Sequence, residues 1–370
     1  PSPMELEDKG KNLDAESWDN TVILPVNVVS NHHRLHQKLD TVQAHFERSP
    51  YNIVEGNGQK GVLVCGYAYQ KLLDLFNEKI PPHLSVARLG SFHPLPEKFV
   101  LNFLKSVETL LVLEETAPLL EDAVTALAQR SGLTLPIFGR HSGDVIRAGE
   151  LDSTLLTDAL NCLLPRFITT SPPTTSRTMP SKQFYPADCP YIPIFETLLD
   201  VISQFGTRQD TIIIGDPGCM VRGQNHFDLM DVKTSLGASI SIAAGISRTL
   251  IKQKIQKCVI ALTGDSSFLH TNFFGLIDAV QIGAKMLVLV LDNNTTALSG
   301  GQPHPGTRIG DQRDSHPPVE IAELAVQAGA KFVQIVDIDR FEDLRPAILR
   351  GMETEGVSVV IARGDCPGCL

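Results

Sequence analysis

Two polar side chains follow apolar, strand-like runs in the second half of the sequence. Asp265 lies at the end of the run Val259 to Ser266, and Asn293 lies twenty-eight positions later at the end of the run Leu287 to Asn294. One amphipathic helix pattern separates the runs, so we expect neighbouring parallel strands whose carboxyl ends place both side chains at one edge of a sheet. The Asp265 carboxylate, the Asn293 amide oxygen and the main-chain carbonyl of Thr295 are hard oxygen ligands, which suit Mg²⁺.

The turn Gly264-Asp265-Ser266 opens the helix between the two runs. Free backbone N–H groups and the positive end of a helix dipole favour an anion at such a place, so a diphosphate would lie beside the cation. A Gly-Asp turn after a buried strand is common in α/β proteins and predicts little alone. The second strand end at this spacing makes a metal-diphosphate site the better interpretation.

Composition excludes several classes of protein. The chain has 370 residues, of which 42% are hydrophobic and 20% charged, which is typical of a soluble protein with two domains. A net charge of −10, without any run of five Lys or Arg, disfavours nucleic-acid binding. No apolar stretch reaches membrane-spanning length, and the first thirty residues lack a signal-peptide pattern, so no membrane contact is expected. Seven scattered cysteines favour a reducing compartment, and we expect a cytoplasmic protein.

The hydrophobic pattern predicts an α/β protein with two domains. Residues 1–20 are polar and acidic and are interpreted as a tail or linker. Short parallel-type strands alternate with helices over residues 21–164, and a segment rich in Pro, Ser and Thr over 165–186 indicates a linker. Near-continuous Val, Ile and Leu runs over 187–365 predict a doubly wound parallel sheet, followed by a terminal CxxC segment at 366–370.

Longer motifs resemble a known enzyme family. The thiamine diphosphate enzymes share a Gly-Asp-Gly signature followed, after a helix and a strand, by Asn-Asn; this chain has Gly264-Asp265-Ser266 and Asn293-Asn294. The stretches Gly264 to Thr307 and Leu236 to Gly245 resemble the indolepyruvate:ferredoxin oxidoreductase alpha subunit, within the 2-oxoacid:ferredoxin oxidoreductase family. The first domain is similar to the family's transketolase-C-like domain, and the resemblance covers about residues 25–365.

This resemblance implies a transketolase-C-like α/β domain followed by a domain that binds the diphosphate of thiamine diphosphate. Family members also carry an earlier pyrimidine-binding domain, whose glutamate activates the cofactor ring, and usually a later ferredoxin-like domain. Neither segment is found in these residues. We therefore expect a pyrimidine-binding domain or subunit as partner, together with ferredoxin, coenzyme A and a 2-oxo acid, and an oligomeric assembly. The chain could equally be a fragment of a longer product.

The resemblance also assigns roles to single residues. His270 follows Asp265 by five residues, and the family has a histidine at this place; it would act as a proton donor or acceptor near the carboxylate of the 2-oxo acid. The alternative is a capping or surface histidine. The expected metal ligands are Asp265, Asn293 and Thr295. The expected cofactor-binding residues are Gly237, Gly264, Asp265, Ser266, Ser267, Asn293, Asn294, Thr295, Thr296 and Cys219.

Two further segments are expected near the cofactor. Gly237 to Gly245 would form a turn and helix N-terminus against the diphosphate or the thiazolium, or else a small-residue helix that packs closely on the sheet. The loop after Asn294 would border the diphosphate. On that loop, His304 stands between two prolines and either contributes to the site or only holds the turn.

The cysteines bear on electron transfer, because iron–sulfur clusters held by thiolates carry single electrons. Cys189 and Cys219 align with two cysteine positions of the family, where the first pattern is Cys-Pro-Gly-Cys-Pro-His-Arg. Here Pro186 replaces one cysteine, and the His-Arg pair is absent. Cys366 and Cys369 form a CxxC that is either the start of a ferredoxin module or two cluster ligands. A [4Fe–4S] cluster is therefore expected on a partner or missing domain rather than on this chain.

The combined prediction is a subunit or fragment of an oxidoreductase that uses thiamine diphosphate and Mg²⁺. It would decarboxylate an aryl 2-oxo acid such as indolepyruvate, reduce ferredoxin and transfer the acyl group to coenzyme A. One alternative is a non-redox thiamine diphosphate decarboxylase or synthase, which keeps the metal site and needs no cluster. Another is a non-catalytic scaffold with a decayed site, suggested by the missing cysteine and His-Arg pair.

Overall fold

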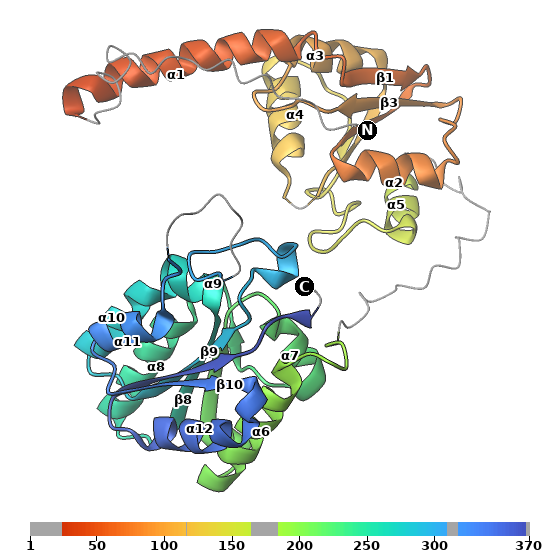
Figure 1. Ribbon diagram of the computed structural model, residues 1–370. Coiled ribbons are helices and arrows are strands. Elements are labelled where there is room, and N and C mark those ends of the chain that lie inside the picture. The colour runs from red at the N-terminus through yellow and green to blue at the C-terminus, as the bar shows by residue number, and fades with distance from the viewer. Residues whose placement is uncertain (1–23, 116, 164–183, 309–316, 368–370) are drawn as a thin grey trace. The chain divides into compact units, whose positions relative to one another are not determined.

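The structure is a computed structural model that describes residues 24–115, 117–163, 184–308 and 317–367. The chain divides into two compact units, Pro1–Met179 and Pro180–Leu370 (Figure 1). The predicted tail over 1–20 and most of the predicted linker over 165–186 lie outside the described residues, and the predicted domain limits remain predictions. Within the described part, no helix is long and apolar enough to cross a membrane.

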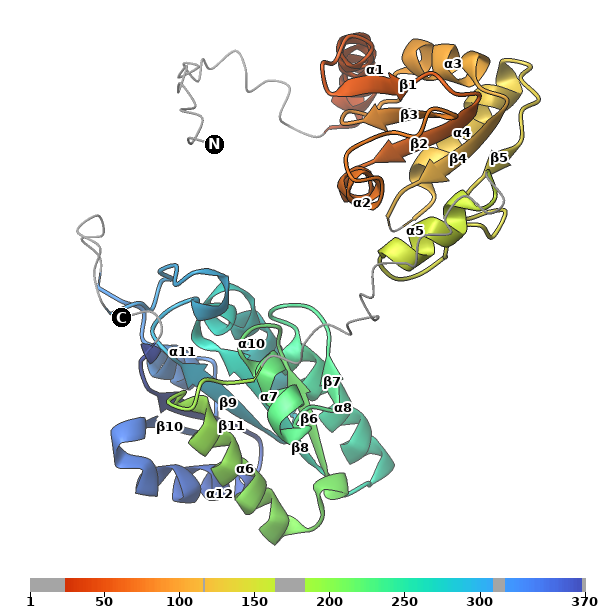
Figure 2. The same cartoon turned by 90° about the vertical axis from the view of Figure 1, so that its right-hand side faces the viewer.

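The described residues of the first unit form a five-stranded sheet with helices on both faces. Its elements are α1 (Pro25–Phe46), β1 (Asn52–Gly56), β2 (Lys60–Cys65), α2 (Tyr67–Leu75), β3 (Leu84–Leu89), α3 (Glu97–Ser106), β4 (Thr109–Leu113), α4 (Leu119–Arg130), β5 (Ile137–Phe138) and α5 (Ser153–Leu160). The strand order is β1-β3-β2-β4-β5, as Figure 2 shows. One apolar core packs under α3 and α4, and the other under α2 and α5.

The first sheet is mixed rather than wholly parallel. The predicted strands β2, β3 and β4 pair in parallel, whereas β1 was not predicted and pairs antiparallel with β3. Only one residue of β1, Asn52, is buried, because β1 lies at the edge of the sheet. A strand with so little buried surface has a weak hydrophobic signal.

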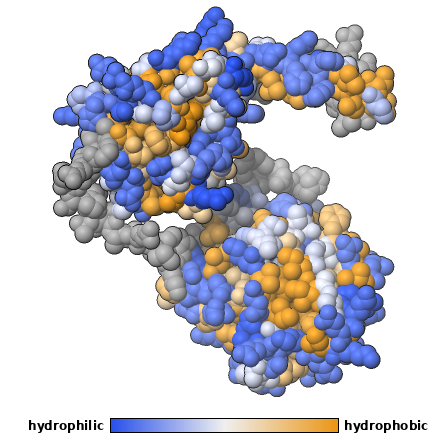
Figure 3. Space-filling model, turned by 180° about the vertical axis from the view of Figure 1, so that it is seen from behind, coloured by the Kyte–Doolittle hydropathy of each residue, from blue (hydrophilic) through white to orange (hydrophobic). Residues whose placement is uncertain are grey.

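Helix α1 is longer than its apolar pattern indicates, and none of its residues is buried. It begins with Pro25 in its first turn, where proline is favoured because its missing N–H needs no partner. Leu24, Val26 and Val29 near this end are exposed, and Figure 3 shows apolar side chains there. The other end is attached to the unit by Gln43, whose side chain donates to the Leu95 carbonyl at 2.8 Å.

The second unit is built on a parallel sheet, as predicted. Its described elements are α6 (Tyr191–Phe205), η2 (Arg208–Asp210), β6 (Thr211–Gly215), α7 (Met220–Phe227), β7 (Val232–Lys233), α8 (Ser239–Gln253), β8 (Cys258–Gly264), α9 (Asp265–Ser267), the π-helix η3 (Phe268–Asn272), α10 (Phe273–Gln281), β9 (Met286–Asp292), η4 (Ala297–Ser299), α11 (Ile321–Gln327), β10 (Phe332–Asp337), η5 (Ile338–Asp343), α12 (Leu344–Glu353) and β11 (Val357–Arg363). The six strands lie in the order β10-β11-β9-β8-β6-β7, and every pairing is parallel.

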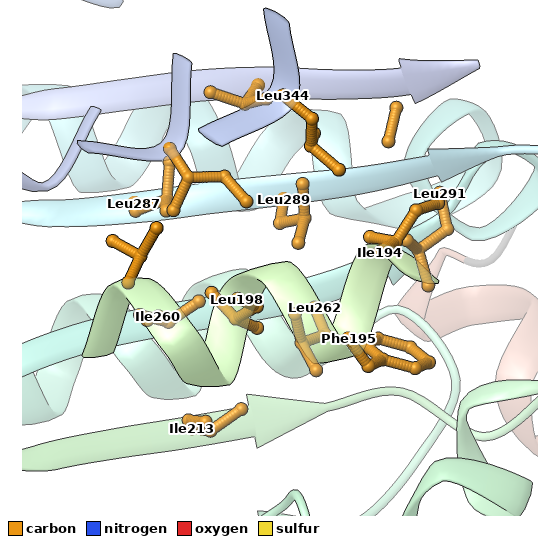
Figure 4. Close-up of a cluster of buried hydrophobic side chains, with 14 of the residues drawn as sticks. Ile194, Phe195, Leu198, Ile213, Ile260, Leu262, Leu287, Leu289, Leu291 and Leu344 are labelled. Carbon is orange, nitrogen blue, oxygen red and sulfur yellow. The ribbon is translucent and has the colours of Figure 1, made fainter. Parts of the chain in front are cut away.

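Helices cover both faces of this sheet, which explains why its central strands are apolar throughout. Alternate residues of β9, Leu287, Leu289 and Leu291, pack toward α6 and α12, and the intervening residues pack toward α8, α10 and α11. Figure 4 shows Phe195 and Leu198 of α6 against the first of these cores. Because burial leaves no place for polar groups within the strands, the first polar side chains stand at the strand ends.

The connections define the place where a ligand would bind. From β6 the chain passes to β7 on one side, and α8 then returns it to β8 on the other side of β6. In open α/β sheets, ligands bind beside the carboxyl ends of the strands at such a reversal of strand order. The carboxyl ends of β6, β8 and β9 are therefore the candidate region.

Candidate functional site

Asp265 directly follows β8 and is 3% exposed. Its Oδ1 accepts a hydrogen bond from the Ser266 N–H at 2.7 Å. Its Oδ2 is buried and makes no hydrogen bond with any described residue, although the Nε2 atom of His304 lies 3.0 Å away. A Cβ atom on the preceding residue, Gly264, would meet nothing within 4 Å. A buried carboxylate oxygen without a hydrogen-bond partner among the described residues fits a bound cation.

Asn293 and Asn294 follow β9, the neighbour of β8, and both are 6% exposed. The Asn293 amide oxygen has only a long hydrogen bond, 3.4 Å, from the Thr295 N–H. The Thr296 hydroxyl donates to the Ser266 hydroxyl at 3.1 Å and so joins this loop to the Asp265 turn. The two predicted strand ends are thus brought together, and the Asn293 oxygen remains available for a second interaction.

The side chain of Asn294 serves the loop itself. Its φ angle is +64°, in the left-handed region that asparagine tolerates. Its Oδ1 accepts the Arg308 N–H at 2.6 Å, which closes the loop between residues 294 and 308. This contact gives Asn294 a structural role beside the cofactor contact predicted for it.

Asp292, the last residue of β9, anchors the same loop. It is 2% exposed and pairs with Arg308 Nη1 and Arg363 Nε, each at 2.9 Å. Burial would raise the pKa of this carboxyl, but the hydrogen bonds and charges of the two guanidiniums outweigh burial and hold the pKa below its usual value. The carboxylate is therefore charged at neutral pH and ties the Arg308 end of the loop and the end of β11 to β9.

Asp216 is a site residue that the sequence prediction missed. It follows β6 and is fully buried. Its carboxylate accepts hydrogen bonds at 2.6 to 3.2 Å from the backbone N–H groups of Ala238 and Ser239 and from the side chains of Thr263, Ser267 and Asn272. A repeated sequence pattern could have identified Asp216. Gly215-Asp216 follows the apolar part of β6 in the same way as Gly264-Asp265 follows that of the adjacent strand β8.

The backbone N–H groups at the start of α8 are occupied by Asp216, and the turn before the helix is tightly packed. The Ala238 and Ser239 N–H groups, which a diphosphate could have used, donate to Asp216. Gly237 has a φ of +76°, and a Cβ at this position would lie 1.6 Å from the Thr271 hydroxyl oxygen. Gly237 is thus required by the backbone and by this contact. A cofactor contact of Gly237 remains a prediction.

His270, predicted to be catalytic, lies on the π-helix and is exposed. No side-chain hydrogen bond or ion pair among the described residues ties His270 to Asp265, whose carboxylate contacts Ser266 and His304 instead. The histidine that the fold brings to Asp265 is His304. The proton-transfer role of His270 remains a prediction.

Three of the four predicted candidate cysteines line one cavity of about 420 Å³ in the second unit. Cys189, Cys219 and Cys366 border it together with Arg222 and Asn293, so the cavity adjoins the metal-site loop. Burial raises the pKa of the Cys189 thiol, which favours the thiol over the thiolate. No three Cys, His, Asp or Glu side chains within the described ranges are arranged to hold a metal ion, and the fourth cysteine, at position 369, lies outside those ranges.

The second unit matches a known family. Residues 216–362 match the thiamine pyrophosphate enzyme, C-terminal TPP binding domain. This range runs from Asp216 to Ala362, within β11, and includes Asp265, Asn293 and His304. The strand ends that carry the candidate site thus lie within the residues that match this family.

The chain as a whole is similar to indolepyruvate oxidoreductase subunits. It is 30% identical to subunit IorA of Archaeoglobus fulgidus, covering 93% of this chain and 55% of the relative. It is 28% identical to subunit IorA of Methanothermobacter thermautotrophicus, covering 93% and 56%. The resemblance inferred from the motifs is thus confirmed, and the chain spans about half the length of these relatives.

Part of the chain is also similar to a solved structure. The 2-oxoglutarate:ferredoxin oxidoreductase from Magnetococcus marinus, with 2-oxoglutarate, coenzyme A and succinyl-CoA bound, is 20% identical with a TM-score of 0.45. The comparison covers 50% of this chain and 64% of that chain.

Proposed function

We propose that this chain is the thiamine diphosphate-binding subunit, or part of the subunit, of a 2-oxoacid:ferredoxin oxidoreductase. An aryl 2-oxo acid such as indolepyruvate would react with coenzyme A and two oxidised ferredoxins to give acyl-CoA, CO₂, two reduced ferredoxins and one proton. The observation that carries this proposal is the orphaned Oδ2 of Asp265 beside Asn293, within residues that match a thiamine diphosphate-binding family. The aryl substrate is suggested by the relatives alone.

The residues present fit a cation bound to a diphosphate. Asp265 Oδ2, the Asn293 amide oxygen and the Thr295 carbonyl offer the hard oxygen donors that Mg²⁺ prefers. Thiamine diphosphate would supply the carbanion chemistry at its thiazolium C2 atom. The chain would hold the cation, orient the diphosphate and, through the Asp292 anchor, keep the loop after β9 in place.

A second candidate is supported by the cysteine cavity. Pro186 stands where the family has a cysteine, and the described residues include no group of three Cys, His, Asp or Glu side chains placed to hold a metal ion. A non-redox decarboxylase or synthase would need no cluster. Iron, sulfide and thiamine contents of the complex isolated with its natural partner distinguish the two candidates, because only the oxidoreductase requires iron and sulfide.

We predict that the isolated chain will not accelerate exchange of the thiazolium C2 proton. Ring activation requires a glutamate hydrogen-bonded to the aminopyrimidine, which by family resemblance belongs to a pyrimidine-binding domain. NMR measurement of C2 deuterium exchange should give the rate of free cofactor for the chain alone and a faster rate when the pyrimidine-binding partner is added. Fast exchange by the chain alone would mean that an acid within these 370 residues activates the ring.

We also predict that the chain alone assembles no complete [4Fe–4S] cluster. Such a cluster takes four thiolates, whereas three cysteines line the cavity and Cys189 favours its thiol form. Anaerobic reconstitution with iron and sulfide, followed by low-temperature EPR of the reduced protein, should give no stoichiometric cluster signal. A full signal that disappears in Cys189→Ala would contradict this prediction and make the chain an electron carrier itself.

A further inference from the structure

His304 is held rigidly in the interior of the second unit. Its side chain is 1% exposed, although it lies on a loop. Prolines flank it on both sides, its backbone N–H donates to the Thr307 hydroxyl at 2.9 Å, and the Pro305 carbonyl accepts the Val319 N–H at 2.9 Å. A Cβ at Gly306 would approach Leu269 to 2.8 Å, so this turn fits closely against the helical segment after Asp265. The imidazole therefore has a fixed place.

The backbone of the same turn determines which ring nitrogen carries the proton. The Gly306 N–H donates a hydrogen bond to Nδ1 of His304 at 3.1 Å. A nitrogen that accepts a hydrogen bond has no proton of its own, so the proton of the neutral ring is on Nε2. An Nε2 atom that carries a proton is a donor and cannot be a metal ligand. His304 thus presents a hydrogen-bond donor, and not a further metal ligand, toward Asp265.

This donor has no acceptor in the structure. Nε2 lies 3.0 Å from Asp265 Oδ2, but the direction of the N–H bond makes no hydrogen bond, and both atoms are buried without a partner among the described residues. A cation on Oδ2 would satisfy the carboxylate and leave the donor unpaired. The group that satisfies the donor must then be an acceptor that arrives together with the cation. An oxygen atom of a metal-bound diphosphate has this property.

We propose that His304 is a diphosphate-binding residue, whose Nε2–H donates to a phosphate oxygen beside the cation held by Asp265. This inference rests on the proposed function and deepens it. The two adjacent side chains then have different roles. The Asp265 carboxylate binds the cation, and the His304 ring binds the diphosphate that coordinates the cation. Affinity for the cation alone should consequently depend on Asp265 and not on His304.

The experiment compares two ligands on the full chain. Binding of Mn²⁺ alone, and of Mn²⁺ with inorganic pyrophosphate, is measured from the EPR signal of free Mn²⁺. His304→Ala should weaken binding of the metal-pyrophosphate about tenfold or more, since a hydrogen bond to a charged group is lost, and leave binding of Mn²⁺ alone within about twofold. His304→Gln, whose amide N–H₂ reaches a place similar to Nε2, should restore most of the loss.

A matched control is the exposed pair His141 and Asp122, with Nε2 and Oδ1 2.6 Å apart. His141→Ala removes a histidine beside an aspartate and should change neither affinity. Equal metal-pyrophosphate affinity in His304→Ala and wild type would overturn the inference. The inference would also be overturned if His304→Ala lost as much affinity for Mn²⁺ alone as for the metal-pyrophosphate, because His304 would then only orient Asp265. A wild-type chain that binds no metal-pyrophosphate would overturn the proposed function as well.

A second measurement needs no ligand. The ¹⁵N chemical shifts of the imidazole should identify Nε2 as the protonated nitrogen of His304, and the His304→Ala spectrum assigns the signals. Protonation at Nδ1 would overturn the inference by itself, because the ring would then present a lone pair to the site and could act as a metal ligand.

Discussion

Asp265→Ala is expected to abolish Mg²⁺-dependent binding of thiamine diphosphate. The variant removes the only anionic group that we assign to the cation, whose Oδ2 has no hydrogen bond with the described residues. The loss should exceed the roughly 10–100-fold that changes to residues supporting metal ligands produce. Asn293→Ala removes a neutral ligand and should weaken binding less. Calorimetric titration with Mg²⁺ and thiamine diphosphate, in the presence of the pyrimidine-binding partner, gives both affinities.

The control for this experiment must separate binding from folding. Asp200→Ala removes another aspartate of the second unit, an exposed one that pairs with Arg345 at 3.1 Å, and should leave the affinity unchanged. Circular dichroism should show both variants folded. Should Asp265→Ala bind the cofactor as tightly as wild type, the metal assignment at this strand end would have to be abandoned.

Asp216→Ala should be the most destabilising single substitution in the site. It leaves five donors without their acceptor in a fully buried place, including two N–H groups at the start of α8. Each buried donor that loses its partner costs about 1–3 kcal/mol, and partial rearrangement of the hydroxyl groups reduces the sum, so we expect a loss of about 3–5 kcal/mol in the free energy of unfolding. Urea unfolding of the full chain measures it.

Asp216→Asn keeps one acceptor oxygen and should recover part of this loss, since the Ala238 and Ser239 N–H groups can still be satisfied. The exposed ion pair between Asp200 and Arg345 should contribute about 0–1 kcal/mol to the free energy of unfolding. Asp200→Ala therefore serves again as the reference variant. Equal unfolding free energies for Asp216→Ala and wild type would mean that this hydrogen-bond cluster does not stabilise the second unit.

The parts of the site that could be predicted are those at the ends of buried strands. Burial on both faces makes β8 and β9 apolar, so Asp265 and Asn293 stand out as the first polar residues after them, and their neighbouring position is confirmed by the pairing of the two strands. The same reasoning applies to Asp216 after β6. It was missed because the following Pro-Gly indicates an ordinary turn, and only the pairing of β6 with β8 shows that two Gly-Asp turns are adjacent.

The contribution of histidines was harder to predict, because it depends on a loop. His270 is close to Asp265 in sequence, but it lies on the π-helix η3, whose turn the sequence pattern does not reveal. Its side chain is exposed. His304 is thirty-nine positions after Asp265, on a segment without periodicity, and its place depends on contacts such as that of Thr296 with Ser266. Contacts between residues this far apart in the sequence cannot be predicted from local hydrophobic periodicity.

The shared carboxylate of Asp292 has a consequence for how two segments of the second unit move. Arg308 comes from the loop that carries His304, and Arg363 ends the strand that leads to Cys366 at the cysteine cavity. The Gly364 N–H also donates to the Asp292 carbonyl at 2.9 Å. The two segments are therefore fastened to the same residue of β9. Because both segments share this anchor, a movement of the loop after β9 should be coupled to a movement of the cavity wall at Cys366.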